Sequence, residues 1–190
     1  MKKEFYLERR TLESNIKIRI NTSAYTRFIK IDSGIKIFDH MLYQTAYHGN
    51  ISMQIKGKGD LQVDTHHTIE DTGIVLGKLL RKIFKYKKNR FISAYTAMDE
   101  ALTRMVMDIS GRSYFNYKLK HSNDEINGIS INKTLEFFKA LVRQAQITLH
   151  LTNYGIDTHH IIESIFKCLG ILIKKSLKLK RKFNHSTKYD

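Results

Sequence analysis

The sequence contains no proline, no tryptophan and a single cysteine among its 190 residues. One cysteine cannot form a disulfide within the chain, which excludes the small disulfide-stapled domains of secreted proteins. Cys168 lies in the apolar segment SIFKCLGILI, and we expect it to be a small buried hydrophobic residue. The lack of proline, beside abundant Lys, Ile, Asn, Phe and Tyr, is typical of drift in an AT-rich genome. Local departures from common motifs are therefore expected.

The sequence also lacks any run of about 18 apolar residues, the length needed to span a bilayer. It starts MKKEFYLERR, which leads into charged residues instead of the apolar core of a secretory signal. We therefore expect a soluble cytoplasmic protein without a membrane partner. With 42% hydrophobic residues, the chain is long enough to bury a core as one compact unit.

Acidic residues are few, 18 against 33 basic ones, which gives a formal net charge of +15. Such an excess suits either nucleic acid or a small phosphorylated substrate. The densest basic segments are 81–90 and 174–182. Neither carries the interleaved aromatic platform of a single-strand binder, so most of these lysines are interpreted as solvated surface. The sequence thus favours a small phosphorylated substrate and predicts no nucleic-acid partner.

An internal repeat organises the chain. The segment DTHHTIE at 64–70 returns as DTHHIIE at 157–163, with only the fifth position changed. Upstream of each segment, a helical pattern leads into an alternating strand, ISMQIKG in the first half and ITLHLTN in the second. Aligning the two strand starts, Ile51 and Ile147, places His40 opposite Glu136.

Both halves are interpreted as β-β-α-β-α, which predicts a duplicated α+β fold. The halves would span residues 1–92 and 93–190 of one fused unit. Apolar residues recur at helical spacing after each His-His pair, so we expect each half to form a sheet with both helices on one face. The strands expected before the two first helices are 5–10, 15–21, 101–110 and 113–119, and the likeliest loops are 87–92 and 120–133.

The chemistry of the repeated segment follows from helix geometry. Residues three or four apart share a helix face, so Glu70 can converge with His66 or His67, whereas adjacent histidines diverge by about 100°. Each histidine of a pair is therefore expected to serve a different metal, completed by ligands from the other repeat or from a neighbouring subunit. Adding the residues on the preceding helices gives two predicted sets of metal ligands: His40, His66, His67, Glu70, and Glu136, His159, His160, Glu163.

Imidazole and carboxylate ligands without thiolate suit a borderline or fairly hard divalent ion, and an octahedral site favours manganese. Asp64 and Asp157 open the two segments and are expected to cap the helices, or alternatively to orient a ligand imidazole. His150 is expected to be a core histidine and is the reserve ligand should Glu136 fail. His48 and His185 are interpreted as ordinary histidines outside the site.

Several long strings resemble imidazoleglycerol-phosphate dehydratase: IFDHMLYQTAYHG, GDLQVDTHHTIEDTGIVLG, AMDEAL, DISGRSYF, ITLHL and THHIIESIFK. They lie in the family's order over nearly the whole chain. The resemblance implies a duplicated fold related to the second domain of ribosomal protein S5. It also implies an octahedral 24-mer with two manganese ions at each subunit-shared site, and removal of water from imidazole glycerol phosphate in histidine biosynthesis.

The resemblance further implies the roles of individual residues. Two cations would favour the imidazolate form of the substrate ring, whose electrons help to expel hydroxide, while Glu13 shuttles protons. The catalytic residues implied are Glu13, His67, Glu70, His160 and Glu163. Substrate contacts are implied for Glu13, Gln44, Arg90, Asp99, Arg112, Lys167, Ser186 and Lys188, with the arginines on the phosphate.

The chain departs from the family pattern at several positions. Lys36 and Ile37 replace the usual Gly and Phe, Ala97 replaces a Pro, and the tail at 185–190 differs from the usual one. Glu136 occupies a place where some relatives carry His. The alternatives left open are another di-metal hydrolase and an S5-like RNA-binding module, which the charge suggests.

Overall fold

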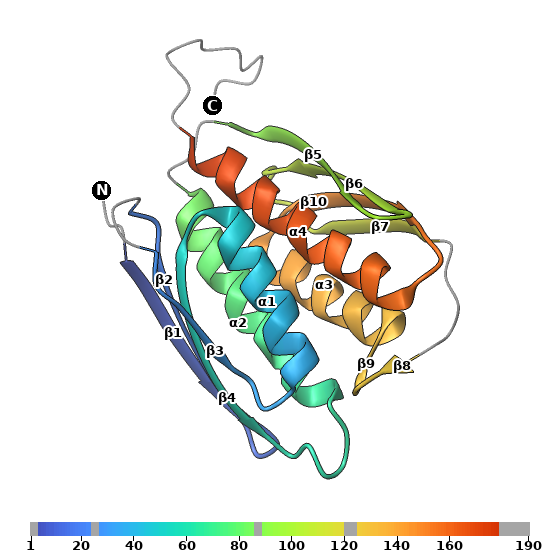
Figure 1. Cartoon of the computed structure of the whole chain (residues 1–190). Coiled ribbons are helices and arrows are strands. Elements are labelled where there is room, and N and C mark those ends of the chain that lie inside the picture. The colour runs from blue at the N-terminus through green and yellow to red at the C-terminus, as the bar shows by residue number, and fades with distance from the viewer. Residues whose placement is uncertain (1–3, 24–26, 86–88, 120–124, 179–190) are drawn as a thin grey trace.

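Two four-stranded sheets enclose four α-helices in the computed structural model, which describes residues 4–23, 27–85, 89–119 and 125–178 (Figure 1). Helices α1 and α2 cover the inner face of the first sheet, and α3 and α4 cover the inner face of the second. Each half is therefore a sheet with both helices on one side, as the periodicity predicts. The predicted α+β class is confirmed.

The first sheet has the strand order β1-β2-β4-β3, with β3 parallel to β4 and the other neighbours antiparallel. Its alternation is strict, since Ile16, Ile18 and Ile20 point inward while Lys17 and Arg19 face solvent. The first half comprises β1 (Glu4–Arg10), β2 (Ser14–Asn21), β3 (Ile29–Asp32), α1 (Lys36–Gly49), β4 (Ser52–Gly59) and α2 (His66–Phe84).

The second sheet repeats this topology with the order β5-β6-β10-β7, in which β7 is parallel to β10. A two-stranded hairpin, β8 and β9, is added before α3. The second half comprises β5 (Phe91–Met98), β6 (Ala101–Asp108), β7 (Tyr114–Leu119), β8 (Glu125–Ile126), β9 (Ile129–Ser130), α3 (Ile131–Ala145), β10 (Thr148–Tyr154) and α4 (Thr158–Leu177).

Each four-stranded sheet contains one strand more than the sequence patterns predict, and the second half also contains the β8–β9 hairpin. Strand β3 has only four residues, too few for a visible alternation, and β5 begins at Phe91 in a segment that was expected to be a loop. The expected boundary at 92/93 therefore falls inside β5. The loop expected at 120–133 is also partly wrong, because its described residues form β8, β9 and the start of α3.

His150 is not the core histidine that its apolar strand suggests. Its neighbours Leu149 and Leu151 point inward, so His150 is exposed on the outer face of the second sheet, beside the Tyr114 ring and 3.4 Å from the Asn116 amide nitrogen. Strict alternation along β10 decides its direction. No contact that the structure describes links His150 to the other candidate ligands.

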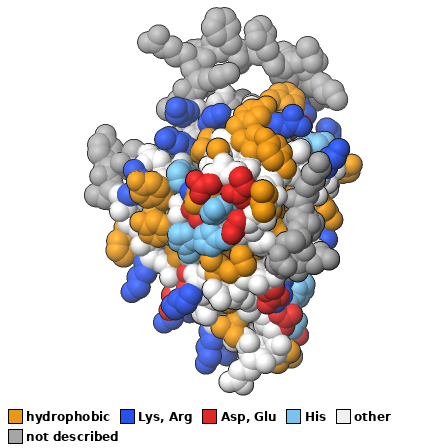
Figure 2. Space-filling model, turned by 45° about the vertical axis from the view of Figure 1, so that its right-hand side comes forward, with side chains coloured by type: hydrophobic (Ala, Val, Ile, Leu, Met, Phe, Trp, Pro, Cys, Tyr) orange, Lys and Arg blue, Asp and Glu red, His pale blue; other side chains and the backbone are white. Residues whose placement is uncertain are grey.

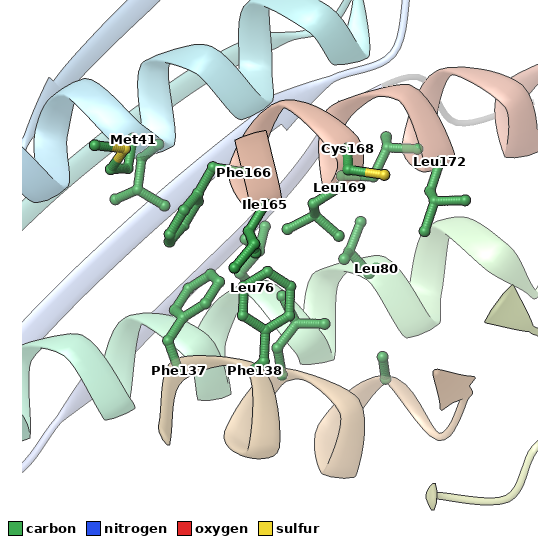
Figure 3. Packing of buried hydrophobic residues seen from close by; sticks show 14 of the residues in the cluster. Met41, Leu76, Leu80, Phe137, Phe138, Ile165, Phe166, Cys168, Leu169 and Leu172 are labelled. Carbon is green, nitrogen blue, oxygen red and sulfur yellow. The ribbon is translucent and has the colours of Figure 1, made fainter. Parts of the chain in front are cut away.

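The core lies between the helices, where α2 packs on α3 and α1 packs on α4. Side chains from all four helices meet there, including Met41, Leu76, Phe137, Phe166 and Leu169 (Figure 3). The Phe137 ring lies 5.3 Å from that of Phe166 and 5.6 Å from that of Phe38, between centroids. The pairing of α1 with α4 and of α2 with α3 joins the two repeats and sets which candidate ligands can meet.

Cys168 is fully buried in this core, as expected, and burial raises the pKa of its thiol to about 11. No described helix has the length and apolar character required to cross a membrane.

Helices α2 and α3 pack closely at Gly73, because this residue has no side chain. A Cβ at this position would lie 2.5 Å from the Phe137 carbonyl oxygen and 3.2 Å from the Ala140 Cβ. We predict that Gly73→Ala lowers the free energy of unfolding by about 1–3 kcal/mol, because the clash outweighs the higher helix propensity of alanine. Urea denaturation measures the change. Lys78→Ala, on an exposed position of the same helix, serves as the control and should stay within about 0.5 kcal/mol. A Gly73→Ala protein as stable as the original would contradict the close packing.

Candidate functional site

The repeated segments form the first turns of α2 and α4. Asp157 is the N-cap of α4, and its carboxylate accepts hydrogen bonds from the backbone N–H groups of His159 at 2.7 Å and His160 at 3.1 Å. The expected capping role of Asp157 is confirmed.

Asp64 behaves differently from Asp157, because α2 starts one residue later, with Thr65 as its N-cap. The Asp64 carboxylate accepts from the His66 N–H at 3.3 Å and also pairs with Lys133 Nζ at 2.9 Å. The hydrogen bond from Lys133 lowers the pKa of Asp64 to about 2. Asp64 thus ties the start of α2 to α3 of the other repeat.

The adjacent histidines of each pair point to different groups. His159 Nε2 lies 2.9 Å from Glu163 Oε2 on the same face of α4, whereas His160 Nδ1 lies 2.8 Å from Glu100 Oε2. The two side chains therefore leave α4 in different directions, as a rotation of about 100° per residue of helix requires.

His40, His159 and Glu163 form a cluster in which one ligand atom from each residue lies within 4.8 Å of the others. His40 comes from α1 and lies 3.4 Å from Glu163 Oε2 through its Nε2. The sequence grouped His40 with His66, but the packing of α1 on α4 places it with the second repeat. Figure 2 shows histidine and acidic side chains gathered on one face of the molecule.

Glu163 is buried, with 4% of its surface exposed. Burial raises the pKa of this carboxyl, but hydrogen bonds from Lys167 and His40 more than offset that effect, so its pKa lies below the usual value. Lys167 Nζ lies 2.8 Å from Glu163 Oε1. Lys167 therefore lies beside the cluster, in contact with its buried carboxylate.

The equivalent group in the first repeat is more open. His66 Nε2 lies 3.5 Å from Glu70 Oε2, and Arg143 of α3 approaches Glu70 Oε1 at 3.9 Å. Glu136 pairs with Lys139 at 2.7 Å. Among the described residues, no three-ligand cluster forms around His66 and Glu70. The structure therefore does not bring Glu136 to these two residues.

His67 lies between two carboxylates. Its Nδ1 is 3.1 Å from Asp60 Oδ2, and its Nε2 is 3.7 Å from Glu13 Oε2 on the β1–β2 turn. The hydrogen bond to Asp60 raises the pKa of His67. The pairing of Glu13 with His67 joins two residues for which catalytic roles are expected.

His160 has the matching environment in the second repeat. Besides Glu100, Asp99 Oδ2 lies 3.6 Å from its Nε2, so the β5–β6 turn supplies what the β1–β2 turn supplies to His67. The hydrogen bond to Glu100 raises the pKa of His160. Asp99 adopts a left-handed conformation with φ of 48°, which the tight turn requires.

The sequence does not single out Asp60 and Glu100, whose carboxylates contact the imidazoles of His67 and His160. Glu100 also accepts from the backbone N–H groups of Ile156 at 3.1 Å and Asp157 at 2.8 Å, and these bonds lower its pKa to about 2, that from Asp157 most. Glu100 is next to Asp99 in MDEAL, and Asp60 precedes the DTHH segment in GDL. The available signals were the place of Asp60 shortly before the DTHH segment and the place of Glu100 directly after Asp99.

The expected substrate contacts divide between two regions. Gln44, one turn after His40, has its amide nitrogen 3.4 Å from His40 Nε2. Arg90 instead pairs with Asp108 at 2.6 Å, at the end of β5 and β6 opposite to the Asp99 turn. Eight residues of strand at roughly 3.3 Å each put Arg90 about 25 Å from that turn.

Arg112 lies on the β6–β7 connection, at the same end of the second sheet as Arg90, and its backbone N–H donates to Ser110 Oγ at 3.2 Å. Ser186 and Lys188 lie outside the described residues. The arginines expected to bind phosphate are thus separated, within one chain, from the histidine clusters.

The donors present fit a divalent cation. The cluster of His40, His159 and Glu163 offers two imidazole nitrogens and one carboxylate oxygen that already converge, with no thiolate among them. This donor set suits Mn²⁺, Fe²⁺ or Zn²⁺.

Comparisons with known proteins agree with this geometry. Residues 33–173 match the imidazoleglycerol-phosphate dehydratase family. The imidazoleglycerol-phosphate dehydratase of Methylococcus capsulatus is 40% identical over 174 residues, covering 90% of this chain and 88% of that protein. That of Bacillus cytotoxicus is 43% identical over 173 residues, with the same coverages of 90% and 88%. The crystal structure of the Staphylococcus aureus imidazoleglycerol-phosphate dehydratase superposes with a TM-score of 0.81 at 33% identity, covering 93% of this chain and 99% of that one. The chain therefore belongs to the imidazoleglycerol-phosphate dehydratase family, the dehydratases of histidine biosynthesis.

Proposed function

We propose that the chain converts imidazole glycerol phosphate to imidazole acetol phosphate at sites that hold two divalent cations, Mn²⁺ by preference, per subunit. The convergence of His40, His159 and Glu163, with His160 directed elsewhere, supports this proposal most directly. The two alternatives, another di-metal hydrolase and an RNA-binding module, are not favoured by the family match.

Two groups of residues would hold the cations. One is His40, His159 and Glu163. The other is His66 and Glu70, with Glu136 proposed as a third ligand that would have to leave Lys139, its partner at 2.7 Å in this chain. His67 and His160 would reach cations shared with neighbouring subunits. Divalent ions would supply positive charge that favours the anionic form of the substrate's azole ring. Glu136 stays the preferred ligand over His150, because His150 is exposed on the outer face of the second sheet.

Glu13 would move the proton. Its carboxylate has 57% of its surface exposed and lies 3.7 Å from His67 Nε2, so it can reach a substrate carbon held beside that imidazole. Glu13 would take the C–H proton and pass it to the neighbouring hydroxyl, which leaves as water. The product of this step is an enol, which becomes the ketone. Asp99 faces His160 in the same way and would contact substrate.

The phosphate would be bound by Arg90 and Arg112 of another subunit. Both lie at the far end of the second sheet, about 25 Å from the Asp99 turn by strand length. Substrate contacts from Lys167, Gln44, Ser186 and Lys188 complete the proposed site. This separation supports a homo-oligomer, proposed as an octahedral 24-mer acting in the cytoplasm.

Removal of the metal is expected to abolish dehydration. After treatment with a chelator and its removal by gel filtration, turnover of imidazole glycerol phosphate should fall to background and return with Mn²⁺, because the site then lacks the positive charge that favours the anionic azole ring. Product formation and metal content are measured on the same sample. Full turnover by protein shown to be metal-free would contradict the proposal. For an RNA-binding module, affinity would instead survive chelation and fall with salt.

His67→Ala is expected to lower kcat by about 10²-fold or more, since the histidine serves both the metal and the Glu13 side of the site. Steady-state kinetics on metal-loaded protein tests this. His150→Asn, which changes an exposed histidine on the outer face of the second sheet, is the matched control and should keep kcat. Unchanged kcat in the His67→Ala protein would show that the ligand assignment is wrong.

A further inference from the structure

Asp71 is a buried carboxylate on α2, directly after the candidate ligand Glu70. Its side chain has 11% of its surface exposed, and its helical neighbours Thr68, Ile69 and Thr72 are fully buried. Burying a carboxylate is costly unless it is paired and hydrogen-bonded. The residues that pair with Asp71 therefore indicate which part of the structure this buried charge holds in place.

Both partners of Asp71 lie at the base of the turn that carries Glu13. Arg9 Nε, near the end of β1, donates to Asp71 Oδ1 at 2.7 Å, and Ser14 Oγ, at the start of β2, donates to Asp71 Oδ2 at 2.5 Å. One carboxylate thus holds the two strands on either side of the turn. Ser14 is 4% exposed, so this contact is shielded from water.

The turn between these two anchors has little packing of its own. Leu12 is fully exposed, and the Glu13 side chain is more than half exposed. Thr11 Oγ1 accepts from the N–H groups of Glu13 at 3.3 Å and Ser14 at 2.9 Å, and the Glu13 carbonyl accepts from the Asp60 N–H at 3.0 Å. Polar contacts alone therefore fix the direction in which Glu13 leaves the turn.

The second repeat shows that a charge is not needed merely to join the helix to its sheet. The repeat offset of 64–70 to 157–163 places Ser164 where Asp71 stands. Ser164 Oγ contacts Thr103 Oγ1 at 2.7 Å and Asn153 Nδ2 at 3.1 Å, all buried and neutral. Thr103 is the third residue of β6 and Asn153 is its pair on β10, so neither is the first residue after the turn, as Ser14 is in the first repeat. The position is thus a charged aspartate in the repeat whose turn carries Glu13, and a neutral serine in the other repeat.

We propose that Asp71 is a positioning residue that, through Arg9 and Ser14, holds the β1–β2 turn so that Glu13 faces His67. This inference rests on the proposed function, in which Glu13 carries the proton. Arg9, Asp71, Glu13 and His67 line one small cavity of about 200 Å³, together with residues from α2 and α3. Asp71 and Glu13 thus line the same cavity.

Asp71→Asn tests the role, because it keeps the size of the side chain and removes its charge. In metal-loaded protein of unchanged particle mass, kcat should fall by about 10- to 100-fold, as expected for a catalytic group displaced by about 1 Å. KM should stay within about threefold, because the phosphate contacts are untouched. Amide exchange should rise in the segment 8–16, and at Asp60, and not elsewhere.

The Glu13→Gln background separates positioning from stability. Because Asp71 acts through Glu13, the double variant Glu13→Gln with Asp71→Asn should be no slower than Glu13→Gln alone. Ser164→Ala, the matched position in the other repeat, should lower stability while keeping kcat. If Asp71→Asn does not fold, Ser14→Ala removes one anchor only and should lower kcat by about 3- to 10-fold with the same exchange pattern.

Three results would overturn the inference: unchanged kcat in folded Asp71→Asn, an additive loss in the double variant, or an equal loss of kcat in Ser164→Ala. Full activity of Glu13→Gln would instead overturn the proposed role of Glu13 itself. The two failures are therefore distinguishable.

Discussion

Two neighbouring histidines on an α-helix cannot face the same ion, and the rest of the candidate site depends on this constraint. One residue of helix turns the side-chain direction by about 100°. His159 therefore meets Glu163 on its own helix and His40 of α1, while His160 meets the carboxylates of the β5–β6 turn. Each repeat offers two different ligand environments separated by a single peptide unit.

The packing of the two repeats decides how these environments are completed. Because α1 lies on α4, His159 meets His40 of the other repeat, and because α2 lies on α3, Arg143 of the other repeat approaches Glu70. The second histidine of each pair faces a turn of its own sheet. Glu13 of the β1–β2 turn faces His67, and Asp99 of the β5–β6 turn faces His160. The symmetry is incomplete, since Glu136 pairs with Lys139 where His40 joins the second cluster. The two repeats therefore place Glu13 and Asp99 alike, but they differ in the contacts of Glu136 and His40.

Much of this arrangement was predictable from the sequence because the repeat is nearly exact where chemistry is concentrated. The histidine pairs, the divergence within each pair and the core-facing stripes follow from local spacing. The partner of His40 did not, because no periodic pattern states which helices pack together. The same holds for the separation of Arg90 from the Asp99 turn, which depends on the strand register. Strand β3 is too short to show a pattern, and His150 faces outward only because of its phase along β10.

The proposed function requires paired cations at sites shared between copies of the chain. The most direct test is the metal content per chain measured together with the particle mass of the same sample, by elemental analysis and native mass spectrometry. About two Mn²⁺ ions per chain in a closed assembly of many copies are expected if the sites are shared in this way. A metal-free particle of 22.3 kDa, the mass of one chain, would contradict the proposed function.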